Sequence, residues 1–256
     1  MAGEAEADVP GMYGGTLRHR GTRIFGACLG APLLVLCVAL TAHAAFASVR
    51  TITRSDATSI ATAISLRHSD LPTMAQHSNP VTPQEQRLNA QATSCAGGVP
   101  PSEAYADTQS PSFVSTGQAS VTVASGVEIL PSASLVAKDF AAIERPDALR
   151  CLTSEFTSAL SPSLPKGDKV TNATASRLPS VVATTGETFE IRLTFDISFR
   201  EGTSTVSVPV YTDQIGFADG QAEVTLEVQT TSVKPSTSLE HQLAGLLLAR
   251  ARTAIG

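Results

Sequence analysis

The stretch Glu187–Arg200, ETFEIRLTFDISFR, alternates apolar with polar or charged side chains along its whole length. Its apolar members are Phe189, Ile191, Leu193, Phe195, Ile197 and Phe199. Because successive side chains of a strand point to opposite faces, this pattern places the whole apolar set on one face. An apolar face opposite a polar one is typical of a half-buried antiparallel strand. The stretch therefore predicts an antiparallel sheet that packs one face against a core.

Neighbouring runs of sequence extend the same sheet. Residues 119–130 are apolar and β-branched, and residues 205–211 and 222–228 alternate on either side of a turn at 218–220. Pro209 inside the second run suggests an edge position or a bulge, because proline has no N–H to donate to a ladder. We expect about four or five strands in all.

Apolar residues at helical spacing surround these strands. Helices are expected from Ser55 to about Asp70, over 134–145 and from Asp147 onward. A closing helix follows, for which Thr237 and Glu240 form a capping box. The expected fold class is α+β, with an antiparallel sheet, helices packed on one of its faces, and one apolar helix at the N-terminus.

The N-terminal segment indicates where the protein resides. Residues 24–47, IFGACLGAPLLVLCVALTAHAAFA, contain no Asp, Glu, Lys or Arg. Such a run can span a bilayer as an anchor, and its small residues also permit signal-peptide cleavage near Ala47. Arginines before the run place residues 1–23 in the cytoplasm by the positive-inside rule. Residues 48–256 are then an exported domain, tethered or secreted, in which 73–119 are expected to be largely irregular.

Export decides how the cysteines are interpreted. Cys28 and Cys37 lie in the apolar segment, where a thiol acts as a small hydrophobe. Cys95 and Cys151 are the pair left in an oxidising compartment, so a disulfide between them is expected. A catalytic thiol or a metal site is the alternative. Neither cysteine, however, belongs to a CxxC motif or has a histidine close in sequence.

No sequence motif for catalysis is present. The loops GxGxxG, GxxxxGK[ST], GxSxG and DxDxDG are all absent. His68 and His77 lack the spacing of zinc ligands, and His68 beside Asp70 suits the end of a helix. Glu190 and Asp196 could form a carboxylate pair for glycoside chemistry, but charges are ordinary on the polar face of a strand. We therefore predict no catalytic, cofactor-binding or metal-binding residue, and no cofactor.

Several short motifs occur in an order that resembles a known group. CAGG begins at Cys95, SPSFVS covers 110–115, and VTVASGVEILPSASLVAKDFAAI covers 121–143 before Cys151. This order resembles actinobacterial exported α+β domains, including the extracellular sensor domain of PknH-type kinases and LpqN-type secreted proteins. The resemblance implies a sensing or ligand-binding module outside the membrane, with a disulfide and a cleft beside the sheet. Two departures are that the kinase sensor domain has more than one disulfide and that no kinase domain is attached here.

These features together favour a non-enzymatic, sensor-like extracytoplasmic domain that binds a small apolar ligand or an envelope protein. A net charge of −5 without a run of Lys or Arg disfavours nucleic acid as a partner. The alternative is a structural or accessory envelope protein without a ligand, and an envelope hydrolase is less favoured. A pocket with convergent titratable groups would indicate the hydrolase, an apolar groove would indicate binding, and a filled core would indicate the structural protein.

Overall fold

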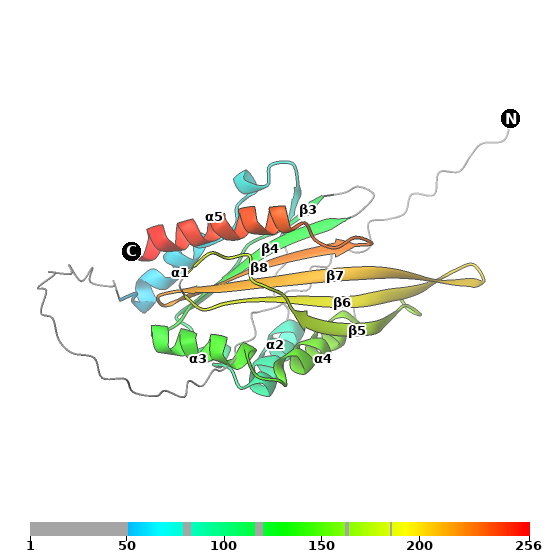
Figure 1. Ribbon diagram of the computed structural model, residues 1–256, viewed down its shortest axis with the longest axis horizontal. Coiled ribbons are helices and arrows are strands. Elements are labelled where there is room, and N and C mark those ends of the chain that lie inside the picture. Colours follow the sequence, from blue (N-terminus) through cyan, green and yellow to red (C-terminus); the bar gives the residue numbers. More distant parts are fainter. Residues whose placement is uncertain (1–50, 79–82, 116–119, 162–163, 185) are drawn as a thin grey trace, which may run out of the picture.

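Figure 1 shows a computed structural model of the chain, which describes residues 51–256 apart from 79–82, 116–119, 162–163 and 185. The strands are β1 (Ala75–His77), β2 (Ala106–Gln109), β3 (Ser112–Ser115), β4 (Val121–Ile129), β5 (Lys169–Arg177), β6 (Thr188–Glu201), β7 (Ser204–Asp219) and β8 (Ala222–Thr231). They form one eight-stranded antiparallel sheet in the order β1-β3-β4-β8-β7-β6-β5, with β2 paired to β4 off this path.

The antiparallel sheet was predicted from the sequence, but the prediction of four or five strands was wrong. Three of the additional strands, β1, β2 and β3, lie within residues 73–119, which were expected to be largely irregular. These three strands are only three or four residues long, too short to show a period. The fourth, β5, is an edge strand with mostly exposed polar side chains, so it lacks the alternation that identifies β6.

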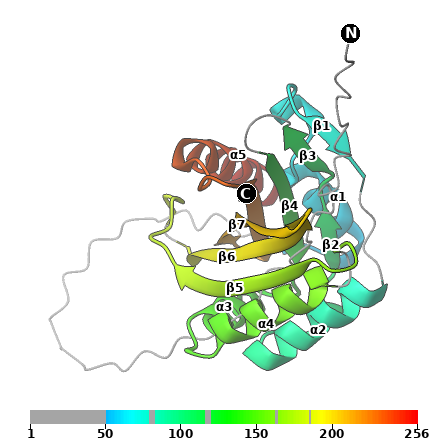
Figure 2. The ribbon, with the colours of Figure 1, turned by 90° about the vertical axis from the view of Figure 1, so that its right-hand side faces the viewer.

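Five α-helices accompany the sheet in the described part of the chain. They are α1 (Arg54–Ile64), α2 (Pro83–Ala96), α3 (Ala133–Ile143), α4 (Ala148–Leu160) and α5 (Thr237–Ile255), and two 3-10 turns, η1 (His68–Asp70) and η2 (Pro101–Glu103), complete the set. Figures 1 and 2 show α1 and α5 on one face of the sheet and α2, α3 and α4 on the other. The expectation of helices on a single face is therefore corrected.

Helices cover both faces because the apolar residues of β6 and those of β8, the strands on either side of β7, point to opposite faces of the sheet. Phe195 of β6 packs against Phe156 of α4, with ring centroids 4.5 Å apart. Leu226 of β8 is instead fully buried in the other core, together with Leu243 of α5. Alternation within one strand does not show on which face of the common sheet its apolar set lies. The result is two hydrophobic cores, one on each face.

Pro209 lies inside β7, a central strand that pairs with both β6 and β8. The last residue pair between β7 and β8 is Val210 with Thr231, so Pro209 lies just beyond the end of β8. Its carbonyl accepts a hydrogen bond from the N–H of Ser232 on that side. The proline nitrogen faces the same side, so the ladder to β6 loses no hydrogen bond, and an edge-like position is reached within a central strand.

The expected disulfide joins Cys95 at the end of α2 to Cys151 in α4, with the two Cα atoms 5.9 Å apart. It ties together two helices of the layer below the sheet. Ser132 is the N-cap of α3, since its side chain accepts a hydrogen bond from the N–H of Leu135.

The apolar segment at residues 24–47, expected to be an anchor or a signal peptide, lies outside the described residues, as does the tail at 1–23. Within the described ranges, none of the helices combines the length and the apolar character that a membrane span requires.

Candidate functional site

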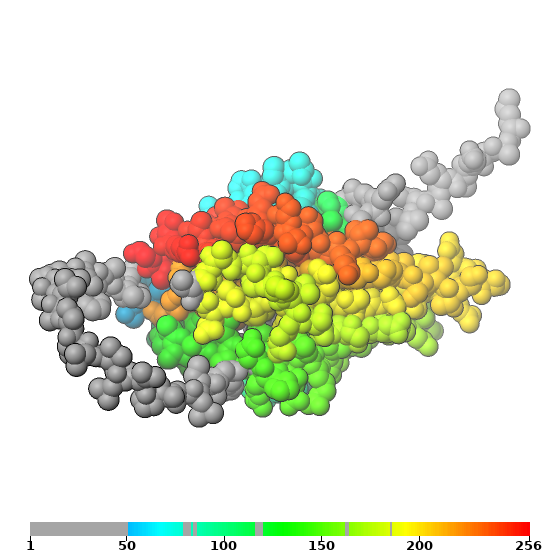
Figure 3. Space-filling model, viewed as in Figure 1, coloured from blue at the N-terminus to red at the C-terminus, as the bar shows by residue number. Residues whose placement is uncertain are grey.

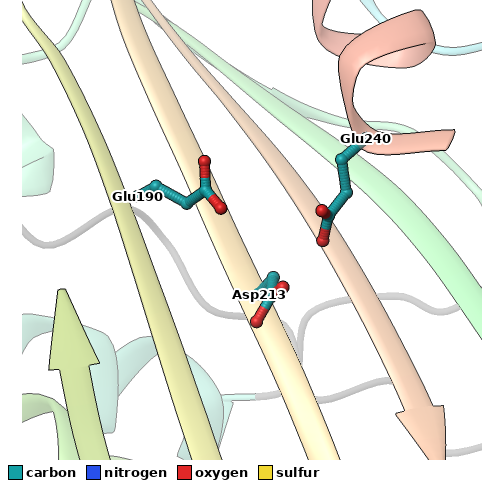
Figure 4. Close-up of side chains that lie close together, drawn as sticks. All are labelled: Glu190, Asp213 and Glu240. Atoms are coloured by element: carbon teal, nitrogen blue, oxygen red, sulfur yellow. The ribbon is translucent and has the colours of Figure 1, made fainter. Parts of the chain in front are cut away.

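Three buried carboxyl groups from three different elements meet on the α5 face of the sheet. Glu190 comes from β6, Asp213 from β7 and Glu240 from the first turn of α5. One oxygen of each lies within 4.8 Å of the others, and the residues are only 5%, 0% and 1% exposed. Figure 4 shows the three side chains pointing toward one another. We call these three residues the carboxylate triad.

The alternation of β6 and its register with β7 create this arrangement. Glu190 and Arg192 occupy the polar face of β6, opposite the face that carries Ile191. The ladder pairs Arg192 directly with Asp213, so that the two side chains are neighbours on the same face. Helix α5 crosses this part of the sheet and adds Glu240 from above.

Arg192 is the cation of the site. Its Nε donates to Oδ1 of Asp213 at 2.6 Å, and its Nη2 donates to Oδ2 of the same carboxylate. The side chain of Arg192 is 15% exposed, and that of Asp213 is inaccessible. The hydrogen bonds that Arg192 donates to Asp213 raise the pKa of Arg192 further, so the guanidinium stays charged. This fork-to-fork ion pair makes Asp213 a charged group at the base of the triad.

Glu190 is also held by the chain segment that links β5 to β6 and crosses over the sheet. We call residues 178–184 the crossing segment. The N–H of Val181 in this segment donates to Oε2 of Glu190 at 2.9 Å. Burial raises the pKa of Glu190, the hydrogen bond from Val181 opposes that rise, and the nearby charge of Asp213 adds to it. Figure 3 shows the yellow-green atoms that precede β6 lying against the orange and red atoms of α5 over this part of the sheet.

Glu240 is the least satisfied member of the triad. Its Oε1 atom is buried and has no hydrogen-bond partner among the described residues. Burial raises its pKa from an ordinary value of 4.5 to about 8, with further contributions from a hydrogen bond to Asp213 and from the negative charges of Asp213 and Glu190. At neutral pH the Glu240 carboxyl group therefore holds a proton, which it can donate to Asp213.

The triad offers hard oxygen atoms and a surplus of negative charge. With all three carboxyl groups ionised, the triad and the one guanidinium would carry two negative charges in a buried place, and a proton on Glu240 reduces this to one. Such a group can hold a proton, as the raised pKa of Glu240 indicates, or an oxygen-preferring metal ion. Acid–base catalysis would also be possible in principle. However, a substrate would have to displace α5 or the crossing segment to reach groups that are at most 5% exposed.

Of the residues that the sequence offered as site candidates, only Glu190 lies in the triad. Glu190 is in the triad, but Asp196 lies further along β6 and accepts a hydrogen bond from Asn172 at 2.7 Å. The pair therefore does not form a common carboxylate site. His68 lies in η1 and His77 in β1, outside the triad.

The cysteines also lie away from the triad. The helices that carry Cys95 and Cys151, α2 and α4, pack on the face of the sheet opposite α5. The disulfide therefore stabilises the scaffold and does not contact the carboxylate triad.

The local sequence around the carboxylate triad does not indicate a site, for an identifiable reason. Glu240 fits a capping box with Thr237, yet α5 begins with Ser236 as N-cap and has no side-chain capping hydrogen bond. The carboxyl group of Glu240 faces Asp213 instead. What distinguishes Glu190 and Arg192 is that α5 and the crossing segment exclude solvent from their face of β6. Only the tertiary structure reveals this.

A second, shallower feature lies on the other side of the molecule. A groove of about 700 Å³ runs between α4 and β5. Its lining is rich in hydroxyl groups and also includes small apolar side chains and one arginine, and consists of Leu149, Arg150, Thr153, Ser154, Thr157, Ser158, Ala173, Thr174 and Ala175. Thr153 and Thr157 donate their hydroxyl protons to carbonyls one turn earlier in α4. These hydroxyls are thus already used within the helix.

Comparisons with known proteins give little guidance. No protein-family model matches the chain, and no curated protein matches it. A solved structure, the extracellular domain of PknH from Mycobacterium tuberculosis, is similar over 80% of this chain and 99% of that chain. The sequence identity is 12% and the TM-score is 0.37. At that TM-score the likeness is loose and carries no information about the activity of this chain.

Proposed function

We propose that residues 48–256 form a non-enzymatic extracytoplasmic domain that binds a ligand and responds to it through the carboxylate triad. In this proposal residues 24–47 tether the domain to the membrane, or cleavage near Ala47 releases it. The apolar run without Asp, Glu, Lys or Arg supports export, and a disulfide between Cys95 and Cys151 is compatible with an oxidising compartment.

The burial of the triad carries the proposal. Its carboxyl groups connect α5 to β6 and β7, so a change in their charge acts directly on the contact between the closing helix and the sheet. Turnover would need repeated access of substrate and water to the reacting groups. A site at most 5% exposed suits binding of a small species that remains in place.

The chemistry of the triad also narrows the class of ligand. It consists of three carboxyl groups beside a guanidinium, and packing an apolar molecule against these groups would leave them without polar partners. A small apolar ligand or an envelope protein, as expected from the sequence, would have to use another surface, for which the groove between α4 and β5 is the candidate. The triad itself favours a small cation.

A structural envelope protein without a ligand is the second candidate. Its support is the two continuous cores, in which the largest side chains are fully buried on both faces of the sheet. In that case the triad would only fasten α5. An envelope hydrolase has narrower support, namely the raised pKa of Glu240, which would suit a general acid.

Native mass spectrometry of the full chain, purified in detergent from its host, separates these candidates. The binding function predicts a co-purified ligand or ion, or a raised melting temperature with a member of a panel of ions, lipids and metabolites. A clean apo mass without any thermal shift would contradict the binding function and favour the structural one. Hydrolysis of an envelope substrate that Glu240→Gln abolishes would instead establish the enzyme.

A further inference from the structure

We propose that the carboxylate triad, Glu190, Asp213 and Glu240, is a calcium-binding site. The inference rests on the proposed function, because it names the ligand of the same site. One oxygen atom from each of the three carboxyl groups lies within 4.8 Å of the other two. The groups come from two neighbouring strands and a helix, and Figure 4 shows all three converging.

The ligand type and the geometry that each ion requires favour calcium among metal ions. Calcium lies about 2.3–2.6 Å from its oxygen ligands, so oxygens on opposite sides of it are about 5 Å apart. Three oxygen atoms within 4.8 Å of one another can therefore be ligands of one calcium ion. Magnesium needs ligands at about 2.0–2.1 Å in a strict octahedron, which demands more exact placement of side chains that come from three separate elements. Zinc prefers nitrogen and sulfur, which the triad does not offer.

Charge gives the second argument. Three carboxylates and the Arg192 guanidinium leave two negative charges when all groups are ionised. A divalent cation balances that surplus, whereas a single proton balances half of it. Unbalanced charge is expensive in a buried place, where little water is present to solvate it. The positive end of the α5 dipole opposes a cation here, but this effect is at most a fraction of one charge.

An unfilled acceptor gives an independent third argument. Oε1 of Glu240 is buried and lacks a hydrogen-bond partner among the described residues, while Glu240 as a whole is 1% exposed. Buried polar atoms almost always have a partner, and an unsatisfied one is costly. The atom belongs to a side chain that points into the triad. A bound cation supplies the partner that the protein does not.

Arg192 need not leave for calcium to bind. It uses both oxygens of Asp213, but each carboxylate oxygen has a second lone pair. Glu190 likewise gives Oε2 to Val181 and keeps Oε1 for a metal. Calcium accepts six to eight oxygens in a flexible shell, so Glu240 can bind through both oxygens and water can complete the sphere. The bound ion would fasten the first turn of α5 to β6 and β7.

The test is a thermal-shift titration of the full chain in detergent at pH 7.5, after treatment with EDTA. Calcium chloride at about 5 mM should raise the Tm by about 5 °C, as expected for an ion that binds with an affinity near 0.1 mM. Magnesium chloride at the same concentration should raise it by less than half as much. Glu240→Gln should fold, because glutamine replaces a protonated carboxyl group, and should remove the calcium shift. Glu201→Gln, an exposed residue on the same strand as Glu190, should keep it.

Two results would overturn the calcium site: no shift of the wild-type chain with calcium, or a shift that Glu240→Gln retains in full. Failure of the calcium site is distinguishable from failure of the proposed function. A chain that ignores calcium but carries an organic ligand in native mass spectrometry loses the calcium site and keeps the binding function. A chain that does neither loses both.

Discussion

The two ends of helix α5 are fastened to the rest of the molecule by carboxyl groups in opposite ways. At its start, Glu240 faces Asp213, and burial raises the pKa of Glu240 to about 8. Near its end, Arg250 donates two hydrogen bonds to Asp70 at 2.7 and 2.8 Å. Burial alone would raise the pKa of Asp70, but the hydrogen bonds from Arg250 and from the N–H of Arg67 outweigh it and lower that pKa.

The difference shows that the partner, more than burial, decides what a carboxyl group contributes. The group on Glu240 is favoured when protonated, so its contribution to stability is complete below pH 4.5 and is lost as the pH rises through about 8. The group on Asp70 is favoured when ionised. Its contribution is present above pH 3.8 and is lost as the pH falls through its lowered pKa. One helix therefore has an alkali-sensitive start and an acid-sensitive end.

The largest loss of stability should come from removing the disulfide, a link that has no titratable group. Cys151→Ser removes the disulfide to Cys95, which closes a loop with a sequence separation of 56 residues. We expect a loss of about 4 kcal/mol in the free energy of unfolding, by the chain-entropy relation. Denaturant unfolding at pH 5 and at pH 8.5 should show the same loss. A loss at only one of the two pH values would mean that the layer of α2, α3 and α4 also depends on the ionisation of a side chain.

Removing the cation at the start of α5 should rank second. Arg192→Met leaves Asp213 charged and inaccessible next to Glu190 and Glu240. The expected cost at pH 7.5 is about 3 kcal/mol, typical of an ion pair broken on one side. Arg200→Met, an exposed position on the same strand, serves as the matched control and should change stability by less than about 0.5 kcal/mol. Equal effects of the two substitutions would contradict the assigned ion pair.

The end of α5 should respond less strongly. Arg250→Met removes the partner of Asp70 and a hydrogen bond to the carbonyl of Ser65. We expect a cost of about 2 kcal/mol at pH 7, because hydrogen bonds to charged groups are worth about that much. The cost should shrink as the pH falls from 3.8 through the lowered pKa of Asp70. Arg252→Met lies on the same helix at an exposed position and should have little effect at either pH.

The last effect has the opposite sign and belongs to Glu240→Gln. In calcium-free protein at pH 9 this variant should be more stable than wild type, because a wild-type pKa raised from 4.5 to about 8 corresponds to several kcal/mol at about 1.4 kcal/mol per pKa unit. At pH 4.5 the two proteins should melt together, because Glu240 is protonated there. A variant that is less stable than wild type at pH 9 would show that the Glu240 carboxylate is stabilising, contrary to its raised pKa.

Sequence patterns predicted those parts of the fold that depend on one element at a time. The alternation of Glu187–Arg200 predicts β6, and the cysteine count predicts the disulfide. The number of strands was not predictable, because β5 is a polar edge strand without alternation. Coverage of both faces was missed since the apolar faces of β6 and β8 point in opposite directions.

The candidate site depends on relations between elements and was not predictable in the same way. Glu190 belongs to a polar strand face that is ordinarily solvated, and Glu240 sits where a capping residue is common. Asp213 carries no local signal. Only the register that pairs Arg192 with Asp213, and the passage of α5 above them, turns these residues into a buried cluster.

The most direct test of the account is the ionisation of Glu240 itself. In calcium-free protein labelled with ¹³C at glutamate side chains, the Cδ resonance of Glu240, assigned through its loss in Glu240→Gln, should titrate with a midpoint near pH 8. Calcium should move that midpoint downward, because the ion favours the ionised carboxylate. A midpoint between 4 and 5 in the calcium-free protein, the ordinary range for glutamate, would contradict the account.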